Sequence, residues 1–200
     1  MTTLPPTRWE LAGASECGYG ETFARRVAEG ADVDGEARLA DALAPRRARI
    51  LDIGSGMGRV SAALQARGHL VLATEPDAAL RAQSEQTYPD LEVLPHQALS
   101  LDPAELGSFD LVVVVGNVMI YLGEDTERRV LERVRDLLAP AGRVLVGFHL
   151  TAVMAGSRTY PADEFVLDAA AAGLRVVHRF GSYELDEPVD DYAVWVLARA

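Results

Sequence analysis

The chain contains no lysine, a single cysteine and no long apolar run. Its longest apolar candidate, Leu111–Val115, has the length of a strand, whereas a helix that crosses a bilayer needs roughly 20 apolar residues. The first residues, Met1–Pro6, carry neither the basic nor the apolar stretch of a secretory signal. These absences predict a cytoplasmic protein with no membrane partner.

Lysine is absent although the chain has 19 basic residues, and the formal net charge is −11. A nucleic-acid binder normally presents a basic surface that neutralises phosphates. The nearest approach is a group of arginines between Arg128 and Arg135, which is interleaved with acidic residues as on a solvated helix face. We therefore expect no nucleic-acid partner.

The single cysteine, Cys17, excludes a disulfide within the chain and argues against a metal site built on thiolates. A nucleophilic cysteine needs surroundings that lower its pKa, and the neighbours of Cys17 in sequence are Glu16, Gly18 and Tyr19. We interpret Cys17 as incidental and predict no metal site.

Apolar periodicity and turn residues divide the chain into short elements after an irregular stretch of about 20 residues. Asp34 is expected to cap the second helix, because its carboxylate can accept hydrogen bonds from first-turn amides. The expected helices are Gly20–Glu29, Asp34–Leu43, Gly58–Arg67, Asp77–Tyr88, Glu124–Leu138 and Ala162–Ala172. The expected strands are Ile50–Ile53, Leu70–Thr74, Leu91–Leu94, Leu111–Val115, Arg143–Phe148, Leu174–Phe180 and Tyr192–Ala198.

Strands that alternate with helices predict an α/β fold with an open, mostly parallel seven-stranded sheet and helices on both faces. The last two strands are separated only by Gly181–Asp191, which is short for a helical crossover and favours a C-terminal antiparallel hairpin with one antiparallel edge strand. The 200 residues fit a single domain, with a helical cap over residues 1–45 and the α/β core over residues 46–200.

The strongest motif is Ile50–Gly58, with the sequence ILDIGSGMG. A strand here ends in a turn almost without side chains and leads directly into a helix. Glycines permit positive φ and let a ligand lie against the backbone. In an open parallel sheet, this first turn lies beside the switch point at which ligands bind.

A carboxylate follows at the place where a nucleoside site needs one. Glu75 ends the second strand, 21 residues after Gly54, and can accept hydrogen bonds from both ribose hydroxyls. The same charge would repel a 2′-phosphate. The glycine turn and Glu75 together predict a nucleoside-containing cofactor.

The glycine run resembles motif I of the class I S-adenosylmethionine-dependent methyltransferases, in which glycines alternate as at 54, 56 and 58. The dinucleotide fingerprint has its third glycine one place later, where this chain has Arg59. The resemblance covers about Arg49–Ala200. It implies the Rossmann-like methyltransferase fold and S-adenosylmethionine as the cofactor. The segment Gly116–Tyr121 lacks the Asn/Asp-Pro-Pro-Tyr signature of the family members that methylate nucleic-acid bases or glutamine, and with the acidic charge this predicts a small-molecule acceptor.

The resemblance also implies which residues hold the cofactor. Glu75 corresponds to the ribose acid, and Pro76 to a residue against the adenine. Where the family often has an aspartate that binds the adenine amino group, this chain has Gln97 followed by Ala98. The implied cofactor-binding residues are Asp52, Gly54, Ser55, Gly56, Gly58, Glu75, Pro76, Gln97, Ala98, Asn117 and Val118.

In this family the N-terminal region often covers the cofactor and places an aromatic residue or an arginine near the methionine carboxylate. The available groups are Trp9, Tyr19, Arg25, Arg26 and Arg38. The sequence does not rank them.

Two residues are expected on the acceptor side. His149 follows the fifth strand and is our candidate for a general base, because strand ends face the ligand crevice and its ordinary pKa lies near neutrality. Tyr121, with Tyr160 as a weaker candidate, is expected to shape the acceptor pocket. His96 and His178 are weaker candidates for the base.

Two other functions stay open at this stage. A nucleotide-dependent oxidoreductase or epimerase of the NAD type is disfavoured by the glycine spacing and by the lack of a lysine for a Tyr-x-x-x-Lys pair. A catalytically silent module that binds S-adenosylmethionine is compatible with every motif, because cofactor binding and catalysis are separable. The chain is expected to be a monomer or a homodimer.

Overall fold

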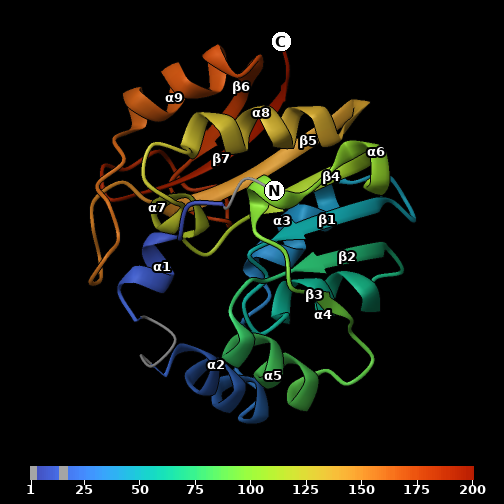
Figure 1. Cartoon of the computed structure of the whole chain (residues 1–200). Helices are drawn as coiled ribbons and strands as arrows, with labels where there is room; N and C mark the ends of the chain where they lie inside the picture. Colours follow the sequence, from blue (N-terminus) through green and yellow to red (C-terminus); the bar gives the residue numbers. More distant parts are fainter. Residues whose placement is uncertain (1–3, 14–17) are drawn as a thin grey trace.

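The structure is a computed structural model that describes residues 4–13 and 18–200, so Cys17 lies outside the described residues. One sheet of seven strands has the order β3-β2-β1-β4-β5-β7-β6 (Figure 1). Its strands are β1 (Arg49–Ile53), β2 (Leu70–Thr74), β3 (Val93–Leu94), β4 (Phe109–Val114), β5 (Leu138–His149), β6 (Leu174–Phe180) and β7 (Tyr192–Arg199). The strands β1 to β5 pair in parallel, and β7 is antiparallel to both of its neighbours.

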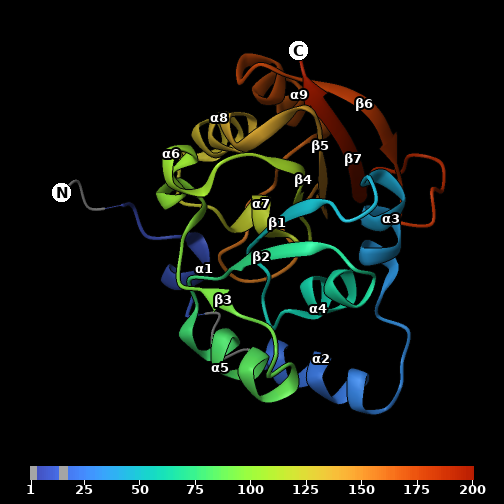
Figure 2. The same ribbon diagram turned by 90° about the vertical axis from the view of Figure 1, so that its right-hand side faces the viewer.

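Helices cover both faces of the sheet, as Figure 2 shows for α8 and α9 on one side and α3 and α4 on the other. The helices are α1 (Arg8–Leu11), α2 (Tyr19–Ala28), α3 (Gly35–Leu43), α4 (Arg59–Ala66), α5 (Ala78–Thr87), α6 (Pro103–Leu106), α7 (Val118–Tyr121), α8 (Glu127–Leu137) and α9 (Ala162–Ala171). A short 3-10 helix, η2, spans Ala98–Ser100. None of the described helices is both long enough and apolar enough to cross a membrane.

Successive residues of the central strands point into two different apolar clusters. In β4, Val112 and Val114 pack with α8 and α9, while Leu111 and Val113 pack with α3 and α4. All four are buried. A strand such as β4 must be apolar throughout because the sheet is covered on both faces. The predicted fold class is confirmed.

The closing hairpin is present, but its antiparallel strand is not at the sheet edge. The strand β7 pairs with both β5 and β6 and lies between them. Residues 193–198 of β7 are all buried, whereas β6 carries Arg175, His178 and Arg179 among its seven residues. The apolar strand occupies the inner position because a polar strand tolerates the half-solvated edge.

The N-terminal part is more regular than expected, since the helix α1 forms within the stretch predicted to be irregular. Its start is a capping box, in which Thr7 Oγ1 accepts from the Glu10 amide and the Glu10 carboxylate accepts from the Thr7 amide. The predicted cap at Asp34 is wrong. Asp34 makes no side-chain cap for α3, and its carboxylate instead lies 3.3 Å from Arg67 Nη2.

Several element boundaries also differ. The helix predicted over Glu124–Leu138 begins at Glu127, after a turn in which Thr126 Oγ1 donates to Gly123 O. Leu138 already belongs to β5, and β3 is only two residues long. The short helices α6 and α7 were not predicted, because four-residue helices carry no periodic pattern.

Candidate functional site

A pocket opens at the carboxyl ends of the parallel strands, where the chain turns from one half of the sheet to the other. It is lined by Gly54–Met57 in the turn after β1, by Glu75–Pro76 after β2, by His96–Leu99 after β3 and by Val115–Val118 after β4. The predicted cofactor residue Gly58 is not part of the lining, and its Cβ position faces Leu91 and Ser84 instead. Four separate strand ends thus contribute to one concave site.

The turn after β1 depends on its glycines. Gly54, Gly56 and Gly58 have φ values of 69°, 59° and 84°, which side-chain-bearing residues rarely adopt. A Cβ atom at Gly54 would lie 2.6 Å from Val118 Cγ2, so the turn also packs tightly against the loop after β4. At Gly56 the nearest atom, Tyr19 Cε1, is 3.6 Å from the Cβ position, which leaves the backbone there open to a ligand.

The Glu75 carboxylate faces this turn from the end of β2. Its Oε2 accepts from the Gly56 amide at 3.0 Å, and its Oε1 accepts from the Asp77 amide at 2.9 Å. Burial raises the pKa of Glu75 to about 7, against the hydrogen bonds from these two amides, which lower it. The carboxylate is therefore held in one orientation and is poised between its two protonation states near neutral pH.

Asp52, near the end of β1, lines the pocket and is almost completely buried. Its Oδ2 accepts from Ser61 Oγ at 2.6 Å, and burial raises its pKa to about 6. Beside it, Ser55 Oγ is buried and has no hydrogen-bond partner among the described residues. An unpaired buried hydroxyl in a pocket wall is a natural contact for a polar ligand atom.

The residues predicted to hold the adenine also lie in the pocket wall. Pro76, Gln97 and Ala98 all line it. The Gln97 amide nitrogen lies 3.4 Å from the Glu10 carboxylate, so α1 reaches over this side of the pocket. His96 lines the same wall.

On the other side of the pocket, the loop after β4 has an unusual backbone. Gly116 and Asn117 follow one another with φ values of 71° and 76°. Asn117 Oδ1 accepts from the His149 amide at 2.9 Å and lies 3.1 Å from His149 Nδ1. Asn117, Val118 and Tyr121 line the pocket, whereas His149 lies behind Asn117 and is not part of the lining.

The structure places the remaining histidine and tyrosine candidates elsewhere. Tyr160 is fully buried against Phe148 and Phe165, and its hydroxyl donates to Asp168 at 2.9 Å. His178 lies in β6 and stacks on Phe180. Neither residue lines the pocket.

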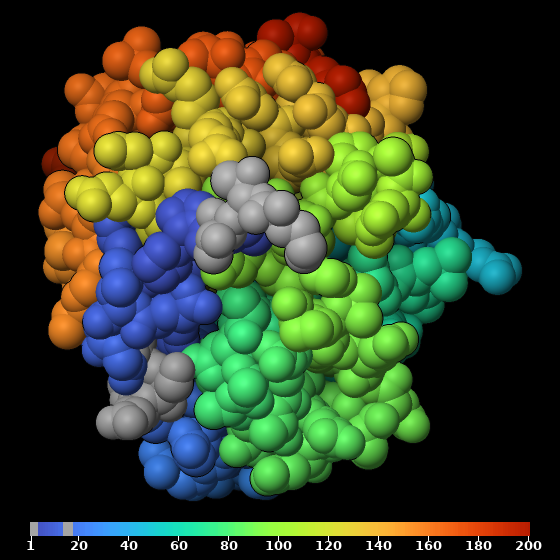
Figure 3. Space-filling view, in the orientation of Figure 1, coloured from blue at the N-terminus to red at the C-terminus, as the bar shows by residue number. Residues whose placement is uncertain are grey.

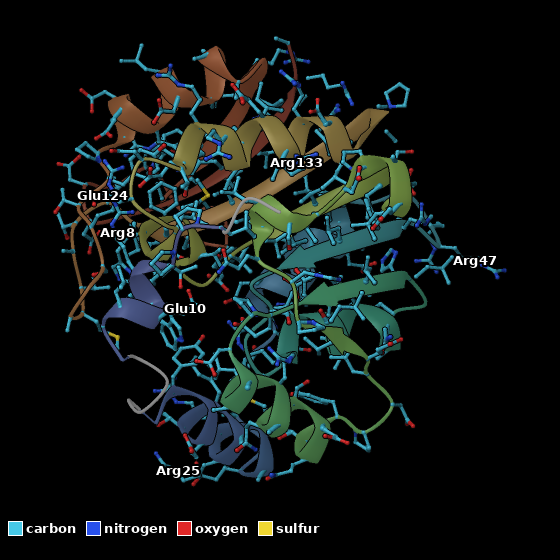
Figure 4. The ribbon with its side chains drawn as sticks, viewed as in Figure 1. Arg8, Glu10, Arg25, Arg47, Glu124 and Arg133 are labelled. Carbon is cyan, nitrogen blue, oxygen red and sulfur yellow. The ribbon has the colours of Figure 1, made fainter. Side chains whose placement is uncertain are left out.

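The five N-terminal candidates separate into two groups. Trp9 and Tyr19 line the pocket, and the three arginines do not. Arg25 extends away from the molecule, as Figure 4 shows, and Arg26 and Arg38 line a second, shallower hollow between α2 and α3.

One arginine that the sequence did not single out does line the pocket. Arg59 is the first residue of α4 and donates from Nη1 to Val33 O at 2.5 Å and to Glu36 Oε2 at 2.7 Å. Its guanidinium also packs over the Phe23 ring. Its position directly after the glycine run was the signal that could have identified it.

A short N-terminal strap, Thr7–Ala12, closes the pocket from outside. Arg8 Nη1 donates to the buried Glu127 carboxylate and to Leu122 O, both at 2.9 Å. Arg158 donates to the same Glu127 oxygen at 2.8 Å. In Figure 3 the N-terminal segment, in blue, fills the surface between the green and yellow parts of the chain.

The residues of this pocket fit an adenosine-containing cofactor. A fixed carboxylate is available for ribose hydroxyls, an unpaired Ser55 hydroxyl lies in the wall, and the Gly56 backbone is open to a ligand. Among the described residues, no group of three or more histidine, cysteine, aspartate or glutamate side chains is arranged to hold a metal ion.

Comparisons with known proteins agree with this assignment. A family model described as "Methyltransferase domain" matches residues 50–142. A solved structure described as a TehB-like SAM-dependent methyltransferase from Corynebacterium glutamicum is 34% identical, with a TM-score of 0.82 over 94% of this chain and 99% of that one. No curated protein matches the sequence.

More distant structures show the same fold. The CcbJ methyltransferase from Streptomyces caelestis is 20% identical, with a TM-score of 0.73 over 84% of this chain and 90% of that one. The 1,6-didemethyltoxoflavin-N1-methyltransferase from Burkholderia thailandensis, solved with its acceptor and S-adenosylhomocysteine, is 19% identical. Its TM-score is 0.64 over 100% of this chain and 92% of that one.

Proposed function

Because this chain belongs to the class I S-adenosylmethionine-dependent methyltransferases, as its 34% identity to a relative that it covers almost completely shows, we propose that it methylates a small-molecule acceptor. The chain is an enzyme of this family, and S-adenosylmethionine is its cofactor. The observation that carries the proposal is the partly enclosed pocket, one side of which the strap Thr7–Ala12 covers beside the proposed cofactor-binding turns.

Three further observations support a small acceptor. The net charge of −11 disfavours a nucleic acid. The lining of the pocket beyond the predicted cofactor residues is largely apolar and includes Pro5, Tyr121 and Met154. The distant relative from Burkholderia thailandensis was solved with a small acceptor, although other structural neighbours are described as glycopeptide methyltransferases.

When bound, S-adenosylmethionine supplies a methyl group activated by a sulfonium, and transfer proceeds by in-line displacement. The protein binds and orients the two reactants and excludes water. We propose that Glu75 binds the ribose, that Gly54–Gly58 lie along the cofactor, and that Asn117 and Val118 separate it from the acceptor. Such positioning can contribute about 7–11 kcal/mol to the lowering of a barrier.

The two proposed acceptor-side residues differ in their position relative to the pocket. Tyr121 lines the pocket and is available to shape the acceptor site. His149 touches the loop that lines the pocket through Asn117. Its role as a general base stays a prediction, and proton removal is needed only for an acceptor that carries its proton at the reaction pH.

A thermal-shift comparison of S-adenosylhomocysteine with NAD tests the cofactor half of the proposal. A ligand that binds only the folded state raises its apparent stability, so S-adenosylhomocysteine is expected to raise the Tm and NAD to leave it unchanged. Transfer of a radiolabelled methyl group to small-molecule fractions tests the acceptor half. Labelling confined to protein or nucleic-acid fractions would refute the small-molecule acceptor.

A further inference from the structure

Three aromatic rings from three different helices meet in the wall of the pocket. They are Trp9 of α1, Tyr19 of α2 and Tyr121 of α7, and all three line it. The Trp9 ring is perpendicular to both tyrosines, with centroid distances of 6.3 Å to Tyr19 and 5.2 Å to Tyr121 and interplanar angles of 81° and 86°. We call these three residues the aromatic enclosure.

The aromatic enclosure spans the crevice between the two halves of the sheet. Tyr19 lies across the turns after β1 and β4, since its Cε1 is 3.6 Å from the Cβ position of Gly56 and its hydroxyl oxygen is 3.8 Å from that of Gly116. Trp9 reaches from Tyr121 on one side to Asp77 on the other, beside Glu75. The rings therefore lie between the proposed ribose site and the loop that faces the acceptor.

The position of Trp9 is set by its own hydrogen bond and by the ion pair of the preceding residue. Trp9 Nε1 donates to Asp77 Oδ2 at 2.6 Å, while Asp77 Oδ1 caps α5 by accepting from the Ala79 and Leu80 amides. The preceding residue, Arg8, is bound to Glu127. Asp77 thus acts as a positioning residue, because it orients Trp9 through the indole N–H.

Aromatic faces attract cations, and the attraction is strongest for tryptophan. The charged neighbours Arg59 and Glu36 neutralise one another in a close ion pair. Burial raises the pKa of Tyr19, which keeps its ring neutral. The cofactor is a cation at its sulfonium before transfer, and its demethylated product has a neutral thioether.

We propose that the aromatic enclosure recognises the positive charge of the methyl donor, so that these rings favour S-adenosylmethionine over S-adenosylhomocysteine. This inference rests on the proposed function and adds to it a reason why the demethylated product is released after transfer. Because the two ligands differ by one methyl group and one charge, each serves as the control for the other.

The test is to measure the Kd of both ligands by calorimetry for the wild-type protein and for Trp9→Leu and Tyr121→Leu. Loss of one ring is expected to raise the Kd of S-adenosylmethionine by about 3- to 30-fold. The Kd of S-adenosylhomocysteine is expected to rise by less than about 3-fold, because this neutral ligand loses only packing contacts with the ring. Phe23→Leu is the matched control, since Phe23 contacts Tyr19 but does not line the pocket, and its Kd ratio should be that of the wild type.

Asp77→Asn tests the positioning role. An asparagine oxygen can still cap α5, but its amide nitrogen cannot accept from Trp9 Nε1. We expect Asp77→Asn and Trp9→Phe each to raise the Kd of S-adenosylmethionine by a few-fold. The double variant should bind S-adenosylmethionine no more weakly than the weaker-binding single variant.

If Trp9→Leu and Tyr121→Leu raise the Kd of both ligands by the same factor, the inference is wrong, because the rings would then contribute packing alone and not recognition of the charge. Additive losses in Asp77→Asn and Trp9→Phe would remove Asp77 from the positioning role. If neither ligand binds to the wild-type protein, the proposed function itself fails. The two failures are therefore distinguishable.

Discussion

The carboxylate of Glu75 accepts a hydrogen bond from the backbone amide of Gly56 at 3.0 Å, which joins the end of β2 to the glycine turn after β1. The two residues come from adjacent parallel strands whose carboxyl ends meet at one edge of the sheet. The contact brings the proposed ribose acceptor against the turn proposed to lie along the cofactor, and Glu75 is buried with a raised pKa.

Binding of S-adenosylhomocysteine should strengthen as the pH rises from 6 to 8, because Glu75 loses its proton near pH 7 and an ionised carboxylate can accept from both ribose hydroxyls. The expected gain in affinity is up to about tenfold. Glu75→Gln should bind more weakly and with a flat pH profile in this range, as measured by calorimetry. A wild-type profile as flat as that of the glutamine variant would contradict the assignment.

The stability of the free protein should change in the opposite direction over the same range. The pKa of Glu75 is raised from 4.5 to about 7 in the folded state, so between these values the unfolded chain binds fewer protons than the folded one. The free energy of unfolding should therefore fall as the pH rises from about 4.5 to 7. Glu75→Gln should remove part of this slope in urea unfolding, and Glu85→Gln on exposed α5 should not.

Gly56→Ala and Gly68→Ala separate backbone strain from the ligand site. Both glycines have positive φ, 59° and 89°, so alanine should cost about 1 kcal/mol of stability at either place. Only Gly56 lines the pocket. The expected result is at least a tenfold loss of S-adenosylhomocysteine affinity for Gly56→Ala and almost none for Gly68→Ala; equal affinities would contradict the proposed path of the cofactor.

Glu127→Ala should loosen the strap Thr7–Ala12. The buried Glu127 carboxylate accepts from both Arg8 and Arg158, and its loss leaves two partly buried guanidinium groups without this partner. Removing one partner of a buried ion pair typically lowers the free energy of unfolding by about 3–5 kcal/mol, which urea unfolding would measure. Asp136→Ala, which removes an exposed pair with Arg135, should cost less than about 1 kcal/mol. A similar small cost for Glu127→Ala would show that the strap is held by other contacts.

His149→Ala is expected to lower turnover by about 10²–10⁴-fold, if His149 removes a proton from the acceptor, with the affinity for S-adenosylhomocysteine nearly unchanged. His149→Asn is the sharper variant, because asparagine can still donate to Asn117 Oδ1 but does not titrate near neutral pH. Turnover is measured with the acceptor found in the labelling screen. Wild-type turnover in His149→Asn would exclude the base role and leave His149 as a residue that orients Asn117.

The parts of the site that could be predicted from the sequence are those encoded by neighbouring residues. Gly54, Gly56 and Gly58 follow a short apolar strand, and Glu75 ends the next one, so the parallel order of β1 and β2 suffices to bring them together. The position of β7 between β5 and β6 was not predicted. It depends on which strand of the hairpin buries more apolar surface, and that is a property of the whole sheet.

The N-terminal contacts join residues that are far apart in the sequence, so no local sequence pattern could predict them. Trp9 meets Asp77 across 68 residues, and Arg8 meets Glu127 across 119. The capping box at Thr7 and Glu10 was a local signal for α1, but it does not indicate where the helix docks. Arg59 was missed for a similar reason, since only the fold shows that a residue after the third glycine faces both the pocket and Glu36.

The glycine turn, the acid after the second strand and the alternation of strands and helices can all be predicted from the order of residues, because backbone freedom and apolar periodicity act between residues that are close in the chain. That Trp9, Tyr19 and Tyr121 meet in the wall of the pocket, and that His149 lies behind Asn117, becomes visible only in the folded chain. These arrangements follow from packing between distant elements, where many weak contacts compete and no single residue pair specifies the outcome.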